Sequence, residues 1–367
     1  MSIFRQNYLI GRSFTTGFDW KLNGAVLFLS FLSLLSLFST KPGLFYKQLL
    51  WIIIGIFIAF LITQIDWRSF VNYKGMVWGF YVFAVSLLAL TLVLAPQIRG
   101  ARSWIPLGSF QLQPSEFVKI ALIIFLANFF SKRHKGIALV SNLIYSFALF
   151  VLPAALIMAQ PDFGSALLVF SIWFGFVLVS GIRYKHLAII IVTFLVATGL
   201  MWSFVLKDYQ KERITGLFFS QRDALGINYN VIQSKIAIGS AGFFGKGFKQ
   251  GSQAQLGFLP EAQTDFIFAA IVEEWGLISA FLIFAAFLLM ILRIVKIGLD
   301  ADNNFGKFLC LGSAILFLAN FLFNIGSNIA LTPVIGVPFP FLSYGGSHII
   351  TDFILIGFVQ AVKIRRA

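Results

Sequence analysis

Residues 257–293 read GFLPEAQTDFIFAAIVEEWGLISAFLIFAAFLLMILR. From residue 266 onward the stretch is almost entirely apolar, and it is long enough to cross the roughly 30 Å hydrocarbon core of a bilayer as a helix. The same stretch holds four carboxylates, in a chain with only 14 acidic residues: Glu261, Asp265, Glu273 and Glu274. Because a carboxylate is costly in hydrocarbon, these residues indicate chemistry or transport.

The composition extends the membrane interpretation to the whole chain. Of 367 residues, 59% are hydrophobic, 11% are charged and 45 are phenylalanine, and the mean hydropathy is +0.90. A water-exposed domain of this composition would be insoluble, so an all-α polytopic membrane protein is predicted. We expect about ten membrane-spanning helices, over residues 22–39, 47–64, 75–95, 115–131, 141–159, 165–181, 186–206, 266–293, 307–330 and 347–363.

The distribution of charge predicts the orientation. An even number of spans places both termini on one side, and most Lys and Arg residues fall in the predicted loops of that side, which makes it cytoplasmic. The net charge of +14 therefore reflects topology, and we expect no nucleic-acid partner. The segment after the first span lacks a cleavage pattern, so that span should remain as an anchor. Cys310, the one cysteine, falls inside a span and is expected to be a small core residue.

Three connecting segments are longer than the rest, at 96–114, 207–265 and 331–346, and the predicted topology puts all three outside. We predict a single domain over 1–367, with a large extracytoplasmic loop over 207–265 before the eighth helix. The cytoplasmic loops are too short for a nucleotide-hydrolysing domain, so no nucleotide cofactor is expected. The working face should be extracytoplasmic.

The long loop carries positive charge on the side where the positive-inside rule disfavours it. It touches anionic lipid headgroups or binds a phosphate or pyrophosphate. Residues 239–248 imitate a P-loop, but Ser240 and Gly247 break the pattern. The glycines there either bring the backbone close to a ligand or only turn the chain. The loop cations are Lys207, Lys211, Arg213, Arg222, Lys235, Lys246 and Lys249.

Two motifs place charges at predicted helix starts. In QPSEFVK at 113–119, Glu116 falls in the first turn and Lys119 three residues later, so the two can pair on one helix face. Asp162 either caps the next helix or binds a cation. Asp265 stands at the outer mouth of its span, either as an N-terminal helix charge or as a chemical group. It would share a helix face with Glu261 if that segment were helical.

The proline-broken stretch 333–346 is predicted to re-enter the membrane, where non-helical backbone must be covered by protein or line a cavity. Asp352, inside the last span, requires an interior partner that the sequence does not identify. His348 is predicted to stand alone, and the other two histidines fall on the cytoplasmic side, so zinc catalysis is not expected.

An outward-facing site without ATP acts on an activated substrate or uses a gradient. Cations beside a carboxylate suit transfer from a lipid pyrophosphate, because cations stabilise the leaving group and the carboxylate accepts a proton from the attacking hydroxyl. Transport is the main alternative.

Several motifs together resemble the SEDS family (shape, elongation, division and sporulation) of bacterial cell-wall proteins. The resemblance covers most of the chain, and the short tails are more like those of the elongation members than of the division members. The motifs are GARSWIPLG at 100–108, QPSEFVK at 113–119, QPDFG at 160–164, QSKIAIGS at 233–240, the segment 251–276 and PFPFLSYGG at 338–346.

The resemblance implies a peptidoglycan glycosyltransferase of the bacterial cytoplasmic membrane that polymerises lipid II on the outer face. It implies a class B penicillin-binding protein as cross-linking partner, and other proteins of the elongation complex. Asp265 matches the acidic loop residue that the family requires. It would deprotonate the GlcNAc 4-hydroxyl of the acceptor, which attacks the MurNAc anomeric carbon with inversion and releases undecaprenyl pyrophosphate. A divalent cation, Mg²⁺ or Mn²⁺, is implied to assist, with Asp265 as a candidate ligand.

Glu116 and Lys119 match a polar pair that the family keeps near its cavity. The expected substrate contacts are Arg102, Glu116, Lys119, Arg213, Gln233, Lys235, Lys246, Glu261 and Ser343. Ser103 stands where the family often has arginine, which leaves Arg102 as the arginine of that motif. Two alternatives stay open: a lipid II flippase, which needs polar groups through the full membrane depth, and a non-catalytic scaffold, which needs no polar cavity. Glu273 and Glu274 are exceptions to the clustering of polar groups near the outer end.

Overall fold

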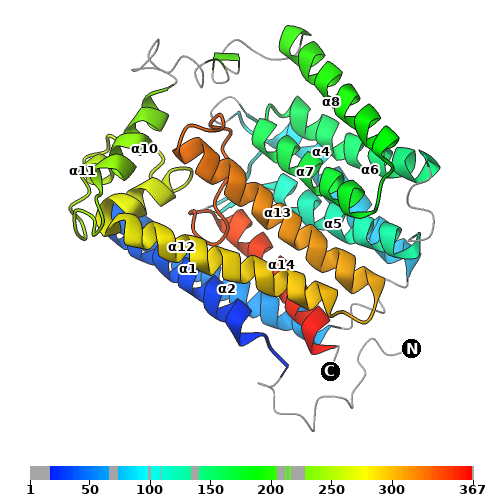
Figure 1. Ribbon diagram of the computed structural model, residues 1–367, viewed down its shortest axis with the longest axis horizontal. Helices are drawn as coiled ribbons and strands as arrows, with labels where there is room; N and C mark the ends of the chain where they lie inside the picture. The colour runs from blue at the N-terminus through cyan, green and yellow to red at the C-terminus, as the bar shows by residue number, and fades with distance from the viewer. Residues whose placement is uncertain are drawn as a thin grey trace.

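The computed structural model describes residues 17–65, 73–97, 101–108, 110–133, 140–204, 211–212, 215 and 228–365. Its ten long helices coincide with the ten predicted spans, which confirms an all-α polytopic fold (Figure 1). Within the described ranges nine are long and apolar enough to cross a membrane, and α7 is a shorter apolar helix. The helices are α1 (Trp20–Thr40), α2 (Pro42–Gln64), α4 (Lys74–Leu94), α5 (Pro114–Lys132), α6 (Val140–Ala159), α7 (Phe163–Val179), α8 (Tyr184–Phe204), α12 (Ile267–Leu299), α13 (Asn304–Asn328) and α14 (Gly346–Ile364).

Smaller elements occupy the predicted long connections. Strands β1 (Ile105–Leu107) and β2 (Phe110–Leu112) pair antiparallel, with Ile105 opposite Leu112. The described part of the predicted long loop contains two helices, α10 (Tyr229–Ser240) and α11 (Ser252–Gln255), and α10 packs on α12 and α13. This loop is therefore partly folded onto the helical bundle.

Helix α5 lies at the centre of the bundle, and most of its residues are buried. It contacts α4, α7, α13 and α14, so side chains on its first turns reach the interior. Helices α2 and α14 approach closely because a glycine stands at their contact: a Cβ at Gly357 would lie 2.9 Å from the Cα of Ala59. Small residues at such crossings allow helix backbones to pack tightly within a membrane.

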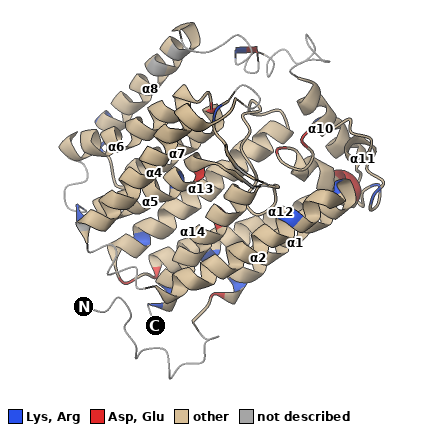
Figure 2. Cartoon of the chain, turned by 180° about the vertical axis from the view of Figure 1, so that it is seen from behind, with Lys and Arg blue, Asp and Glu red and all other residues tan. Residues whose placement is uncertain are grey.

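Charged residues are sparse along the helices, and most of the ribbon in Figure 2 is apolar or uncharged. One end of the bundle, near the termini, is fixed by Asp19, which caps α1 and pairs with Arg293 of α12. Burial opposes the ionisation of Asp19, but hydrogen bonds from Arg293 and from the Leu22 N–H outweigh it and hold its pKa below the usual value. The opposite end, where β1, β2, α10, α11 and residues 329–345 lie, is called the loop end below.

Helix α12 is kinked at Gly276, which has φ 73° and ψ −174°. A Cβ at Gly276 would lie 2.3 Å from the carbonyl oxygen of Phe243, and one at Gly245 would lie 2.2 Å from that of Glu274. The backbone N–H of Lys246 donates to the Glu273 carbonyl at 2.9 Å. The loop formed by residues 241–248 therefore turns the chain and approaches the α12 backbone. There the kink frees carbonyl groups for new hydrogen bonds.

Candidate functional site

Asp265 lies in a tight turn at the loop end, one residue before Phe266, the N-cap of α12. Residues 261–266 form turns, so the conditional expectation that Glu261 and Asp265 share a helix face does not apply. Glu261 has φ 55°, and its carbonyl accepts hydrogen bonds from the N–H groups of Thr264 (3.0 Å) and Phe266 (3.2 Å). These bonds close the turn that presents Asp265.

Two asparagines near the end of α13 fix the Asp265 backbone. The Asp265 carbonyl accepts from Asn324 Nδ2 at 3.0 Å and from Asn328 Nδ2 at 2.9 Å, and both asparagines are fully buried. Asn328 Oδ1 in turn accepts the N–H of Ala269 in the first turn of α12. Asp265 as a whole residue is partly exposed. The positive end of the α12 dipole favours negative charge at this position.

The stretch 338–346 holds the other side of the turn. Ser343 Oγ donates to the Thr264 carbonyl at 2.7 Å and accepts from the Phe339 N–H at 2.9 Å, while the Tyr344 N–H donates to the Gln263 carbonyl at 2.9 Å. Both hydrogen bonds of the Ser343 hydroxyl are made with backbone groups, so Ser343 positions the turn in this structure. Phe339, Phe341 and Leu342 are fully buried, so of the two expectations, protein covers this part of the non-helical stretch.

Gln48 of α2 is a buried residue whose role the sequence did not reveal. Its Nε2 donates to the Ser343 carbonyl at 3.2 Å, and its Oε1 accepts the Gly345 N–H at 3.3 Å. Its position near the start of a predicted apolar span was the available signal, because a buried amide needs hydrogen-bond partners. Gln48 thus ties the stretch 338–346 to α2.

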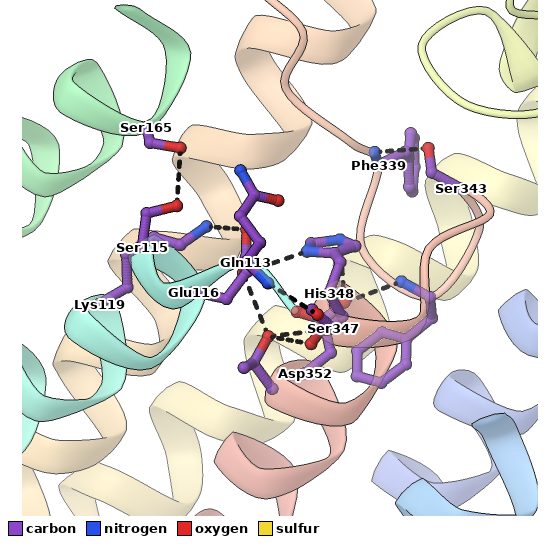
Figure 3. A network of polar contacts seen from close by, with 12 residues as sticks. Gln113, Ser115, Glu116, Lys119, Ser165, Phe339, Ser343, Ser347, His348 and Asp352 are labelled. Atoms are coloured by element: carbon purple, nitrogen blue, oxygen red, sulfur yellow. Dashed lines mark hydrogen bonds and ion pairs between the residues drawn. The ribbon is translucent and has the colours of Figure 1, made fainter. Parts of the chain in front are cut away.

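A second polar group lies on α5 and α14 (Figure 3). Lys119 Nζ lies 2.6 Å from Glu116 Oε1, so the predicted pairing is confirmed, and Thr351 Oγ1 donates to Glu116 Oε2 at 3.1 Å. His348 Nδ1 lies 3.6 Å from Glu116 Oε2, and its Nε2 lies 3.2 Å from Asp352 Oδ2. His348 thus lies between two carboxylates, which the sequence did not show. The partner sought for Asp352 is His348, and the i,i+4 spacing on one helix was the signal for it.

The two groups are joined by the stretch 338–346. Asp352 Oδ2 accepts the Phe341 N–H at 3.2 Å, and Phe341 is two residues from Ser343, which binds the turn before Asp265. Burial raises the pKa of the phenol of Tyr344, the residue after Ser343, above its usual value. A change in the α5–α14 group can therefore reach the Asp265 turn through a few backbone bonds.

Asp162 acts as a helix cap. Its Oδ1 accepts the Ser165 N–H at 3.0 Å at the start of α7, and its Oδ2 accepts from Ser165 Oγ at 2.8 Å and from Gln113 Nε2 at 3.3 Å. Ser347 Oγ accepts the Gln113 N–H at 3.1 Å. The capping alternative is confirmed, and these bonds bring the first turns of α5, α7 and α14 together at the loop end.

Lys246 forms an ion pair with Glu273 and does not take part in the contacts that fix the Asp265 turn. Lys246 Nζ lies 2.7 Å from Glu273 Oε1 and donates to Ser252 Oγ at 2.9 Å. Glu273 also accepts the N–H groups of Gln253 and Ala254 at the start of α11. Glu274 accepts from Ser39 Oγ at the end of α1 and from Gln255 Nε2. The two glutamates thus fasten the α11 segment to the bundle at the loop end.

The other predicted contacts come from separate segments of the chain. Lys235 is exposed and Gln233 partly exposed on α10, which meets the Asp265 support through Ser234 Oγ, a donor to the Asn328 carbonyl at 2.9 Å. Arg102 is exposed, and its backbone N–H donates to the Gln160 carbonyl. Arg213, like Lys207 and Arg222 of the same loop, lies outside the described residues.

Neutralising Lys246 should destabilise the fold, whereas neutralising Lys235 should not. Lys246→Met leaves the fully buried Glu273 carboxylate without its cation. Breaking a buried ion pair costs about 3–5 kcal/mol of stability. This cost is an upper bound here, because the Lys246 side chain is 26% exposed. Lys235→Met is the matched control on exposed surface. Thermal unfolding of both purified variants measures the difference. Equal melting temperatures would contradict a structural role for Lys246.

The described residues contain no group of three or more His, Cys, Asp or Glu side chains that could hold a metal ion. That observation argues against an all-protein cage within the described part of the chain. Mg²⁺ and Mn²⁺ sites often use one or two carboxylates together with substrate phosphates. The carboxylate of Asp265, a partly exposed residue, fits such a shared site.

Comparison with known proteins gives consistent matches over nearly the whole chain. The profile of the FtsW/RodA/SpoVE family, described as cell cycle protein, matches residues 14–367. Peptidoglycan glycosyltransferase MrdB of Escherichia coli K12 is 34% identical over 349 residues, covering 93% of this chain and 91% of the relative. The MrdB of Helicobacter pylori 26695 is 38% identical over 334 residues, covering 89% and 85%.

Two solved structures share the fold. A chain from a peptidoglycan synthase complex, solved to show how polymerization and crosslinking are coordinated, matches with a TM-score of 0.81 and 31% identity, covering 96% of this chain and 99% of that one. The rod shape determining protein RodA of Thermus thermophilus matches with a TM-score of 0.72 and 28% identity, covering 96% and 98%.

Proposed function

Because this chain belongs to the FtsW/RodA/SpoVE family and is a peptidoglycan glycosyltransferase of the elongation type, we propose that it polymerises lipid II with Asp265 as general base. It is a multi-pass protein of the bacterial inner membrane. The loop end would face outward, where Lys and Arg residues are fewer in the short connections.

The rigid support of Asp265 is the observation that carries the proposal. Its backbone carbonyl is fixed by Asn324 and Asn328, and the preceding carbonyl by Ser343, while the residue as a whole stays partly exposed. A general base must be held within hydrogen-bond reach of the proton that it accepts. Bonds from two elements that fix the Asp265 backbone at the start of a helix support this role.

In the proposed reaction, Asp265 accepts the proton of the acceptor's GlcNAc 4-hydroxyl. The hydroxyl oxygen forms a bond to the MurNAc anomeric carbon of the donor lipid. The bond from that carbon to the pyrophosphate oxygen breaks, its electron pair leaves with undecaprenyl pyrophosphate, and the configuration inverts. Exposed cations such as Lys235 and Arg102 are candidates to stabilise the leaving group. A divalent cation shared between Asp265 and the pyrophosphate would supply further positive charge.

The position of the polar groups favours transfer over transport. Counting 1.5 Å per residue, Lys119 lies about 8 Å and Asp352 about 9 Å from the loop-end starts of α5 and α14, which is the first third of a roughly 30 Å core. Glu273 and Glu274, which the sequence left as exceptions, bind the loop-end segment around α11. A flippase would need polar groups continuing across the bundle.

The partner is proposed from the solved relatives. The matching chain with 31% identity comes from a peptidoglycan synthase complex that couples polymerization with crosslinking. A glycosyltransferase of this kind makes strands that a transpeptidase must join. We therefore propose a class B penicillin-binding protein as partner, with other elongation proteins around the pair.

Purified protein with its partner, whose cross-linking serine is disabled, should convert lipid II into glycan chains. Electrophoresis of the labelled products measures chain formation. The same preparation in liposomes, with lipid II in the inner leaflet, measures translocation. Translocation by a protein that makes no chains would replace the proposal with the flippase, and neither activity would favour the scaffold.

A further inference from the structure

Four ionisable side chains form one buried group between α5 and α14. Glu116, Lys119, His348 and Asp352 are exposed to only 4%, 1%, 5% and 2%. Charges buried in a membrane protein are tolerated when they are paired, because an uncompensated charge keeps its full desolvation cost. With a neutral imidazole the group would hold one cation and two carboxylates. With an imidazolium the group holds two cations and two carboxylates.

The geometry distinguishes these two states. Both ring nitrogens of His348 face carboxylate oxygens, Nδ1 toward Glu116 and Nε2 toward Asp352. A neutral imidazole has one N–H and one lone pair, so one nitrogen would point its lone pair at an anionic oxygen. Neither contact is a well-formed hydrogen bond, so the attraction is between charges. Glu116 is ionised beside Lys119, and the Asp352 oxygen that faces Nε2 already accepts the Phe341 N–H. With both facing oxygens acting as acceptors, only the doubly protonated ring makes both contacts favourable.

We propose that His348 is an imidazolium that neutralises this group and acts as a positioning residue for the transferase. Asp352, held by His348, accepts the Phe341 N–H, and Ser343 in the same stretch binds the carbonyl of Thr264. His348 therefore connects the Glu116–Lys119 pair to the turn that carries Asp265. The positioning role rests on the proposed function; the charge state does not.

The groups that face His348 come from each element around it. Helix α5 contributes Glu116 and, beyond it, Lys119; α14 contributes Asp352; and the stretch 338–346 contributes the Phe341 N–H to the same Asp352 oxygen. Thr351 Oγ1, which lies within hydrogen-bond distance of Glu116 Oε2 and of the Ser347 and His348 carbonyls, adds no charge. One positive charge on His348 balances this set.

The charge state can be measured without any activity. The chain has three histidines, so ¹⁵N-histidine labelling in nanodiscs gives few signals, and the signal missing from His348→Gln belongs to His348. At neutral pH both nitrogens should show the chemical shifts of protonated imidazolium. The shift pair of a neutral tautomer would overturn the proposal, whether or not the protein polymerises lipid II.

The positioning role is tested by restoring neutrality. His348→Gln and Asp352→Asn each leave the group with one unbalanced charge, and each should lower kcat by ~10-fold or more, with little change in the KM for lipid II. The double variant His348→Gln/Asp352→Asn is neutral again and should recover most of the lost kcat. A double variant as slow as the slower single variant, or slower, would overturn the role. If a single variant fails to fold, the labelled wild-type spectrum still decides the charge state, and the folded double variant decides the role by its kcat.

Discussion

Asp265→Asn is expected to lower the rate of glycan polymerisation by about 10²–10⁴-fold, the contribution of a positioned general base. Asparagine has the shape of aspartate but accepts no proton at neutral pH. The contacts that fix the turn use the Asp265 carbonyl, with Asn324 and Asn328, and the Thr264 carbonyl, with Ser343. These backbone contacts are retained in the variant, so a loss of rate at an unchanged melting temperature would be chemical.

The measurement is chain formation from purified lipid II, by wild type and variant, each purified with the partner whose cross-linking serine is disabled. Asp302→Asn is the matched control, because Asp302 is an exposed carboxylate in the connection between α12 and α13, away from the loop end. It should polymerise like wild type. Chains of normal yield and length from Asp265→Asn would refute the role of general base.

The second large effect concerns the ion pair of Glu116 and Lys119. Lys119→Met leaves the Glu116 carboxylate buried without its closest cation, and breaking such a pair costs about 3–5 kcal/mol. Glu116→Gln leaves an unpaired ammonium in the same place. Each single variant should unfold at a clearly lower temperature and polymerise slowly. The double variant should lose much less than the sum, because the pair leaves together.

Thermal unfolding and polymerisation rates of the two single variants, the double variant and wild type form the cycle. Lys307→Met, at an exposed position near the start of α13, is the matched control and should unfold like wild type. Additive losses in the cycle would mean that Glu116 and Lys119 act independently, against the 2.6 Å contact.

Features repeated along the chain, or confined to one turn, could be predicted from the sequence. The ten apolar runs became the ten long helices, because a run long enough to cross hydrocarbon satisfies its own backbone only as a helix. Glu116 and Lys119 pair because three residues on a helix bring side chains to one face. Asp162 caps α7 because its acceptors lie within reach of the next turn.

The candidate site could be predicted only in part. The family resemblance pointed to Asp265, but nothing near it in sequence predicts that Asn324 and Asn328 bind its carbonyl from another helix. Lys246 was grouped with the other loop cations by charge alone, whereas the fold gives it to Glu273. The sequence spacing of Glu261 and Asp265 suggested a shared face, and the local backbone formed turns.

The sequence by itself determined the fold class, the helices and the pairing of Glu116 with Lys119 on one helix. The tertiary structure alone decided which helix faces meet. It brought Gln48 of α2 to the carbonyl of Ser343. It also brought Glu116 to His348, although 232 residues separate this pair along the chain. The physical reason is that helical periodicity fixes the direction of a side chain relative to its own axis. Which neighbour it meets depends on how all the helices pack around α5, and that packing is a property of the whole chain.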